Sequence, residues 1–269
     1  MDRVAELPAG PVAYADVGPR DGLPVCLVHG FPHDRHVWRG QREAVDGALA
    51  GLRLLLPDLP GFGGSAPVAD PSMDAYADAV VAVLDHAGVE RAVLGGLSMG
   101  GYVAFAAWRR HRPRIAALLL CDTRPGGDDG AAREKRTALI ATAEREGAGA
   151  VAAQQLPGQL GKTTRTRAPA LVDEVERMLR RAPVHAITGA LRAMMARPDS
   201  TDTLATIDVP TLVVVGDEDV VTPADEARTM AALVPSSRLV VVEGAGHLAP
   251  LEQPATVNAA IAEFLSVRS

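Results

Sequence analysis

Short apolar runs alternate with longer amphipathic stretches along most of the chain. The apolar runs have the length of buried strands and fall at 11–16, 24–29, 52–57, 91–96, 115–121, 210–216 and 238–243. The amphipathic stretches predict helices near 37–50, 72–88, 99–112, 223–234 and 253–267. Continuously apolar strands that alternate with helices are typical of a mostly parallel sheet with helices on both faces. The pattern therefore predicts an α/β architecture.

This alternation stops after Asp122. Residues 124–203 carry helical patterns at 131–147, 148–156, 169–181 and 184–196, without a convincing strand. We interpret this segment as a helical insertion, so that residues 1–123 and 204–269 form one core domain. The insertion has more basic than acidic residues. We favour solvated helix faces over a surface for anionic substrates as the reason for this charge.

Composition excludes several classes of protein. The chain has 269 residues, of which 48% are hydrophobic, so it can bury a sizeable core and is not a disordered chain. It contains no apolar run of about 18 residues to span a membrane. The formal net charge of −6 disfavours nucleic acid as a partner. The first residues, MDRVAELPAG, lack the apolar region of a signal peptide, so we expect a cytoplasmic protein.

The strongest chemical signal is the pentapeptide Gly96-Leu97-Ser98-Met99-Gly100. It lies between the apolar run at 91–96 and the helix expected at 99–112. A serine in such a sharp turn projects its hydroxyl above the sheet, and the flanking glycines let strand and helix cross closely. Chance produces G-x-S-x-G in a glycine-rich chain, but it seldom supplies the strand before and the helix after. We therefore predict that Ser98 is a nucleophile.

A serine hydroxyl needs a base near neutral pH. His247 lies in a glycine-containing loop that follows the last apolar run, and ligand chemistry collects at the carboxyl ends of strands in α/β sheets. We predict His247 as the base. The other histidines weighed for this role lack a post-strand loop with adjacent glycines. They are His29, His36, His86, His111 and His185.

The base in turn needs an acid that orients it. Asp217 and Asp219 both follow the run at 210–216, so either could reach the histidine. We choose Asp219, because Asp217 also reads as a loop or N-cap residue. Asp122, at the end of the run at 115–121, is a further candidate.

Acyl transfer also requires two donors for the oxyanion of the tetrahedral intermediate. We expect one to be the backbone N–H of Met99, which follows the nucleophile. The other is expected from the loop that begins His29-Gly30-Phe31-Pro32, where Gly30 permits close backbone approach and Phe31 offers its N–H. His29 itself reads as a buried, hydrogen-bonded residue.

Taken together, these motifs resemble the α/β-hydrolase superfamily over essentially the whole chain. The resemblance rests on four separated segments: His29–Pro32, Asp58–Ser65, the turn around Ser98, and the loops of Asp219 and His247. The order Ser98, Asp219, His247 also matches the chain order of triads in this fold. The resemblance implies a Ser-His-Asp hydrolase that needs no cofactor, with residues 124–203 as a helical cap over the active site.

Differences from particular branches narrow the expected reaction. Epoxide hydrolases and haloalkane dehalogenases have a similar His-Gly-Phe-Pro loop, but they place aspartate where this chain has Ser98. The segment Gly-Leu-Ser-Met-Gly-Gly is most similar to esterases, enol-lactonases and metal-free haloperoxidases. We predict hydrolysis of carboxylic esters with small to medium acyl chains. A lactonase, a cofactor-free perhydrolase or haloperoxidase, and a non-catalytic small-molecule receptor on the same fold remain alternatives.

The residues expected to bind substrate are less clearly indicated by the sequence than the triad. We expect a small-molecule ester or lactone to be bound by a set of mostly apolar side chains. This set is Trp38, Leu97, Leu156, Met178, Met194 and Met195. For the cap methionines, packing between helices is the competing interpretation. Gly61–Ala66 formally fits the dinucleotide fingerprint, but flanking prolines argue against it. Cys26 and Cys121 lie in apolar runs and read as packed thiols, and no motif predicts a metal.

Overall fold

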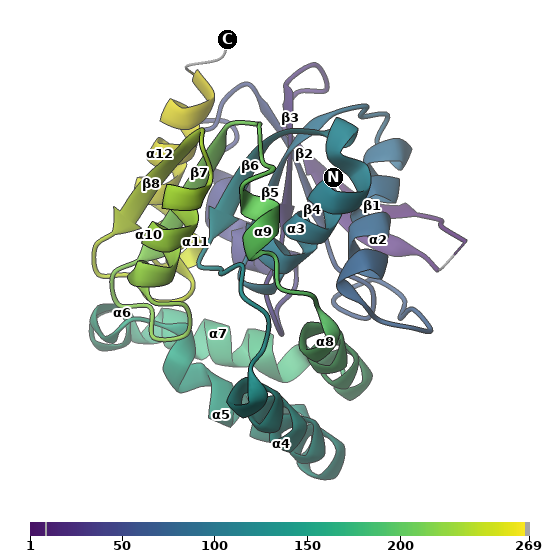
Figure 1. The fold of residues 1–269 in the computed structure, drawn as a ribbon, viewed down its shortest axis with the longest axis vertical. Helices are drawn as coiled ribbons and strands as arrows, with labels where there is room; N and C mark the ends of the chain where they lie inside the picture. The colour runs from purple at the N-terminus through teal and green to yellow at the C-terminus, as the bar shows by residue number, and fades with distance from the viewer. Residues whose placement is uncertain (9, 267–269) are drawn as a thin grey trace.

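A sheet of eight strands crosses the centre of the molecule in the computed structural model, which describes residues 1–8 and 10–266 (Figure 1). The strands lie in the order β1-β2-β4-β3-β5-β6-β7-β8. Their bounds are β1 (Asp2–Ala5), β2 (Val12–Val17), β3 (Leu23–Val28), β4 (Leu52–Pro57), β5 (Ala92–Leu97), β6 (Ile115–Cys121), β7 (Thr211–Gly216) and β8 (Ser237–Val242). The pairs β1–β2 and β2–β4 are antiparallel and the remaining pairs are parallel. The α/β architecture expected from the sequence is confirmed.

All seven strands expected from apolar runs are present. The strand that the sequence did not predict is β1, an edge strand that pairs only with β2. Its residues are half-exposed, with Val4 48% exposed and only Ala5 fully buried. A four-residue strand with one buried side chain leaves too little periodicity to be recognised.

Helices cover both faces of the sheet. On one face, α2 (Met73–His86), α3 (Met99–His111) and α10 (Ala224–Leu233) share a core cluster. On the other, η1 (Arg35–Trp38), α11 (Ala249–Glu252) and α12 (Pro254–Ser266) contribute to a second cluster. The last residue of the helix expected at 253–267 lies outside the described residues. Among the helices of residues 1–8 and 10–266, none is long and apolar enough to span a membrane.

The helix expected at 37–50 is wrong in extent. Only η1 and α1 (Arg39–Glu43) are helical there, and the chain then proceeds through turns to β4. The N–H groups of Gly47 and Leu49 both donate to the carbonyl of Ala44 instead of continuing the helical ladder. The buried Val45 and Leu49 gave the sequence its helical pattern, but glycine at 47 and 51 disfavours a continued helix.

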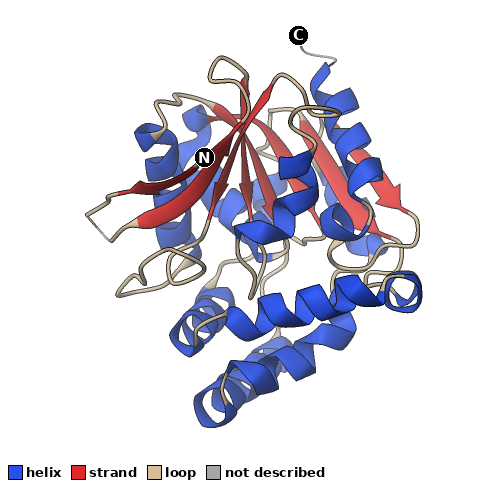
Figure 2. Ribbon diagram, turned by 180° about the vertical axis from the view of Figure 1, so that it is seen from behind, coloured by secondary structure: helices blue, strands red, loops and turns tan. Residues whose placement is uncertain are grey.

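Five helices form a layer along the carboxyl end of the sheet (Figures 1 and 2). They are α4 (Gly130–Glu146), α5 (Ala148–Gln159), α6 (Lys162–Arg167), α7 (Pro169–Arg181) and α8 (Val184–Ala196), and α9 (Thr201–Leu204) leads back to β7. We call the first five the α4–α8 layer. The Asp129 side chain accepts the Ala132 N–H and so begins α4. Helix α6 was not predicted, because its residues KTTRTR carry no apolar periodicity.

Candidate active site

Ser98 occupies a strained turn between β5 and α3. Its φ of 53° lies in the left-handed region, which costs a non-glycine residue about 1–3 kcal/mol. A Cβ on Gly96 would lie 2.2 Å from the carbonyl carbon of Gly100, and one on Gly100 would lie 2.3 Å from the carbonyl oxygen of Val28. The flanking glycines are therefore needed for this crossing, and Ser98 remains partly exposed above the sheet.

Three loops bring Ser98, His247 and Asp219 into one hydrogen-bonded chain. His247 follows β8, and its Nε2 lies 2.8 Å from Oγ of Ser98. Its Nδ1 lies 2.8 Å from Oδ2 of Asp219, which follows β7. The side chains of His247 and Asp219 are 3% and 0% exposed. The structure thus brings together the three residues that sequence reasoning selected from separate loops.

The environment of Asp219 keeps this carboxylate charged. Burial alone raises the pKa of Asp219, but the facing His247 and the hydrogen bonds from Thr222 lower it below its usual value. Oδ1 accepts the N–H groups of Val221 and Thr222, and Oδ2 accepts the Thr222 hydroxyl. Asp217, the competing candidate, is exposed and accepts the Gly244 N–H instead. Asp219 is therefore the aspartate of this loop that can hold the imidazole.

The loop after β3 lies directly against the serine turn. A Cβ on Gly30 would lie 3.0 Å from the carbonyl oxygen of Leu97 and 3.2 Å from Cβ of Ser98. Among the described residues, the backbone N–H groups of Phe31 and Met99 have no acceptor. Both N–H groups are thus free to donate, and their role as oxyanion donors stays a prediction.

His29 fixes this loop rather than taking part in the triad. It is fully buried, its Nδ1 lies 2.9 Å from the Gly30 carbonyl, and its Nε2 accepts the Leu59 N–H. Its ring also packs edge-on against Phe62. The interpretation of His29 as a buried, hydrogen-bonded residue is confirmed.

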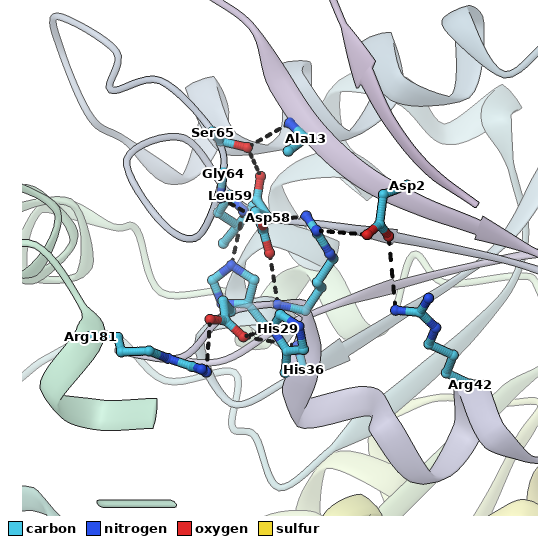
Figure 3. A network of polar contacts seen from close by, with 12 residues as sticks. Asp2, Ala13, His29, His36, Arg42, Asp58, Leu59, Gly64, Ser65 and Arg181 are labelled. Carbon is cyan, nitrogen blue, oxygen red and sulfur yellow. Dashed lines mark hydrogen bonds and ion pairs between the residues drawn. The ribbon is translucent and has the colours of Figure 1, made fainter. Parts of the chain in front are cut away.

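A second polar network explains the glycine-rich segment after β4 (Figure 3). The Asp58 carboxylate accepts the Gly64 N–H at 2.8 Å and the backbone and side-chain N–H groups of Arg35. The Ser65 hydroxyl donates to the Asp58 carbonyl and accepts the Ala13 N–H. The segment Gly61–Ala66 is therefore folded around Asp58, and the next helix, α2, begins only at Met73.

Sequence reasoning missed His33. Its Nε2 lies 2.8 Å from Oε1 of Gln159 at the end of α5, so it connects the Phe31 loop to the α4–α8 layer. The residue is 2% exposed, and burial lowers the pKa of His33 to about 4. No local pattern could have found this contact, because its partners are 126 positions apart.

Two glutamates that sequence reasoning also missed attach α6 to the triad loops. Oε1 of Glu252 accepts the N–H groups of Gly246 and Leu248, the neighbours of His247, and Oε2 accepts the Gly161 N–H. Glu218, next to Asp219, accepts the backbone and hydroxyl groups of Thr163 at 2.8 and 2.7 Å. The loops of acid and base are thus fixed to the same short segment of the layer.

The apolar residues predicted to bind substrate do not form one group. Trp38, Leu97 and Met178 are buried in one core cluster, and Leu156 packs against it. Met194 is 2% exposed and belongs to the cluster that contains Phe31 and Met99, with Met195 packed against it. Their packing accounts for their burial, and contact with substrate stays a prediction.

No metal centre is evident in the ranges 1–8 and 10–266, because they contain no group of three or more His, Cys, Asp or Glu placed to hold an ion. Both cysteines are buried and free. Burial raises the pKa of Cys26 to about 12 and that of Cys121 well above its usual value, so neither is a reactive thiolate.

Residues 24–254 match the family described as alpha/beta hydrolase fold. This chain belongs to the α/β-hydrolase fold family. It is 40% identical to a thermophilic esterase from Thermogutta terrifontis, whose malate-bound structure superposes with a TM-score of 0.93 over 99% of this chain and 98% of that one. It is 32% identical to a non-heme chloroperoxidase from Kitasatospora aureofaciens over 88% of both chains. It is also 31% identical to epoxide hydrolase A from Mycobacterium tuberculosis over 91% of both.

Proposed function

We propose that this α/β hydrolase cleaves carboxylic esters with small to medium acyl chains through a Ser98–His247–Asp219 triad. The observation that carries the proposal is the continuous hydrogen-bonded chain from Oγ of Ser98 through both ring nitrogens of His247 to Oδ2 of Asp219. The relationship to the Thermogutta terrifontis esterase supports it.

Acylation begins when Nε2 of His247 takes the hydroxyl proton of Ser98 while Oγ attacks the ester carbonyl carbon. The carbonyl π electrons move onto its oxygen, and the N–H groups of Phe31 and Met99 stabilise the resulting oxyanion. The oxyanion then re-forms the carbonyl and expels the alkoxide, which receives the proton from His247. Asp219 stabilises the imidazolium between these steps.

Deacylation repeats the sequence with water. His247 removes a proton from the water as its oxygen attacks the acyl carbonyl of the Ser98 ester. The second tetrahedral intermediate collapses, the bond to Oγ breaks, and Oγ regains the proton from His247. The products are the free acid and the regenerated enzyme, and the triad returns to its starting protonation state.

Ser98 also separates this chain from an epoxide-opening reaction, although epoxide hydrolase A is among its relatives. Epoxide hydrolases, which the sequence resembles in its His-Gly-Phe-Pro loop, carry aspartate at the position of Ser98. An alkyl-enzyme ester requires that carboxylate, which a hydroxyl does not replace. The proposal is therefore acyl transfer.

The α4–α8 layer acts in this proposal as a lid over the acyl site. A cavity of about 440 Å³ is lined by Phe31 and by residues of α4 and α5. Its other lining residues include Lys135, Arg136, Gln154 and Gln155. An ester bound in this cavity would contact Phe31, whose N–H is the proposed oxyanion donor.

A second reaction at the same acyl-enzyme is favoured by the chloroperoxidase relative. Hydrogen peroxide in place of water would attack the acyl carbonyl and give one proton to His247. The tetrahedral intermediate would then collapse, the bond to Oγ of Ser98 would break, Oγ would regain the proton from His247, and a peroxy acid would leave. This reaction needs no additional residue, because the acyl-enzyme and the oxyanion donors are shared.

A fluorophosphonate probe tests the proposal, since it reacts covalently with an activated serine. We expect rapid labelling of the parent protein, none of Ser98→Ala, and strongly slowed labelling of His247→Ala. Labelling that survives Ser98→Ala in a folded protein would overturn the assignment. A protein that binds small esters tightly but is never labelled would be a receptor.

A further inference from the structure

The segment Cys121–Thr123 at the end of β6 touches all three loops that carry Ser98, Asp219 and His247. The Cys121 carbonyl accepts the Ser98 N–H at 2.9 Å, and the Thr123 hydroxyl donates to the Ser98 carbonyl at 2.7 Å. These two bonds hold the serine turn from both sides. Neither Cys121 nor Thr123 supplies a group that reacts.

Asp122, between them, reaches the other two loops. Its Oδ1 accepts the Gly216 N–H at 2.9 Å, three positions before Asp219. Its Oδ2 accepts the Ala249 N–H at 3.1 Å, two positions after His247. Asp122 is 0% exposed and has a φ of 45°, so its side chain leaves the strand end in an unusual direction.

We propose that Asp122 is a positioning residue that sets the alignment of the acid loop with the base loop, with Thr123 extending this alignment to the serine turn. The inference rests on the proposed function. One carboxylate bridges two peptide N–H groups on different loops, so a change in the position of either loop must break a buried hydrogen bond. Such a bond is costly to leave unmade.

The position of the His247 ring must be accurate for catalysis. Both hydrogen bonds of His247 are 2.8 Å long, and proton transfer requires both at once. A misplacement of about 1 Å costs a reaction roughly 100-fold in rate. Glu252 holds the peptide groups on either side of His247, but it joins them to Gly161 of the layer and not to the acid loop. The acid and base loops also meet through the Asp217–Gly244 bond and through the Glu218 N–H, which donates to the Ala245 carbonyl. The Asp122 side chain differs from both because it is fully buried and reaches the two loops from β6, the strand whose end also holds the serine turn.

Asp122→Asn tests the proposal, because the amide keeps the shape but offers only one acceptor oxygen for two N–H donors. We expect kcat to fall about 10- to 100-fold while KM changes less than about twofold. Amide hydrogen exchange at Gly216 or Ala249 should become faster. Thr123→Val removes only the bond to the Ser98 carbonyl, so we expect a smaller fall in kcat; it serves if Asp122→Asn does not fold.

Asp16→Asn is the matched control. Asp16 is also a paired carboxylate, with a side chain 6% exposed and its Oδ1 2.9 Å from Nε of Arg53, but it lies on β2 near the far edge of the sheet. We expect this variant to lose stability and keep its kcat. Parental kcat in both folded Asp122→Asn and folded Thr123→Val would overturn the positioning role. Ser98→Ala measured alongside separates the two ideas, because activity that survives it refutes the proposed function instead.

Discussion

Nε2 of His247 lies 2.8 Å from Oγ of Ser98, although the two residues are 149 positions apart in the chain. This contact exists because β5 and β8 are parallel members of one sheet and both end at the edge that faces the α4–α8 layer. The chemistry proposed for the protein depends on that contact.

Because Asp219 is the proposed acid, substitutions of Asp219 and of the nearby Asp217 should have very different effects on kcat. Asp219→Asn removes the charge that stabilises the imidazolium and permits the wrong ring tautomer, so we expect kcat to fall by about 10⁴-fold. Asp217→Asn is the matched control, because this exposed carboxylate bonds to Gly244 and not to His247. Steady-state kinetics on one ester would compare the two. Equal losses would show that the acid has been assigned to the wrong residue.

The base predicts how ester hydrolysis responds to acidity. A protonated His247 cannot accept the proton of Ser98, so kcat/KM should fall as the pH is lowered. A rate profile between pH 5 and 8 on an uncharged ester would measure this. A flat profile with unchanged folding would contradict the role of His247.

His33 predicts a pH-dependent loss of stability. The pKa of His33 is lowered from 6.5 to about 4 by burial, so between these values the unfolded chain binds a proton that the folded protein does not. The contribution of neutral His33 to the free energy of unfolding is therefore fully present above pH 6.5. It is lost as the pH drops toward 4, by at most roughly 3 kcal/mol.

Urea unfolding of the parent and of His33→Gln at pH 7 and pH 5 measures this effect. The variant should lose less stability between the two pH values, although some loss remains because burial also lowers the pKa of His29. Curves with the same pH dependence in both proteins would show that His33 does not titrate as its burial requires.

The positive charge of Lys135 should lower KM for esters that carry a negative charge. Lys135 is exposed and lines the same cavity as Phe31. Lys135→Glu should raise KM about 2- to 5-fold for an ester with a distal carboxylate, and leave a neutral ester of the same length unchanged. Kinetics at low and high salt would reveal the screening of this effect. Identical changes for both esters would exclude a charge contribution.

Much of this fold was readable in the sequence, because strands buried on both faces require continuous apolar runs. The serine turn could also be predicted, because a Cβ on its glycines would lie as close as 2.2 Å to neighbouring atoms, so that only glycine fits there. The loops of Asp219 and His247 could be located because parallel strands bring their carboxyl ends to one edge.

What remained hidden depends on contacts between distant residues. The His33–Gln159 contact and the bonds of Glu252 to both sides of His247 join segments that share no periodicity. Asp122 was weighed only as a competing acid, because its two peptide partners become neighbours after folding. The prediction of a helix over 37–50 was wrong in extent for a related reason. Buried side chains in successive turns have the same spacing as the apolar face of a helix.

Turnover of chromogenic esters, from acetate to a long acyl chain, tests the central claim most directly when the parent protein is compared with Ser98→Ala. The account predicts turnover that is highest for short to medium chains and falls by about 10⁴-fold or more in the variant. Turnover that Ser98→Ala retains, or a labelled and folded parent protein that hydrolyses none of these esters, would contradict it.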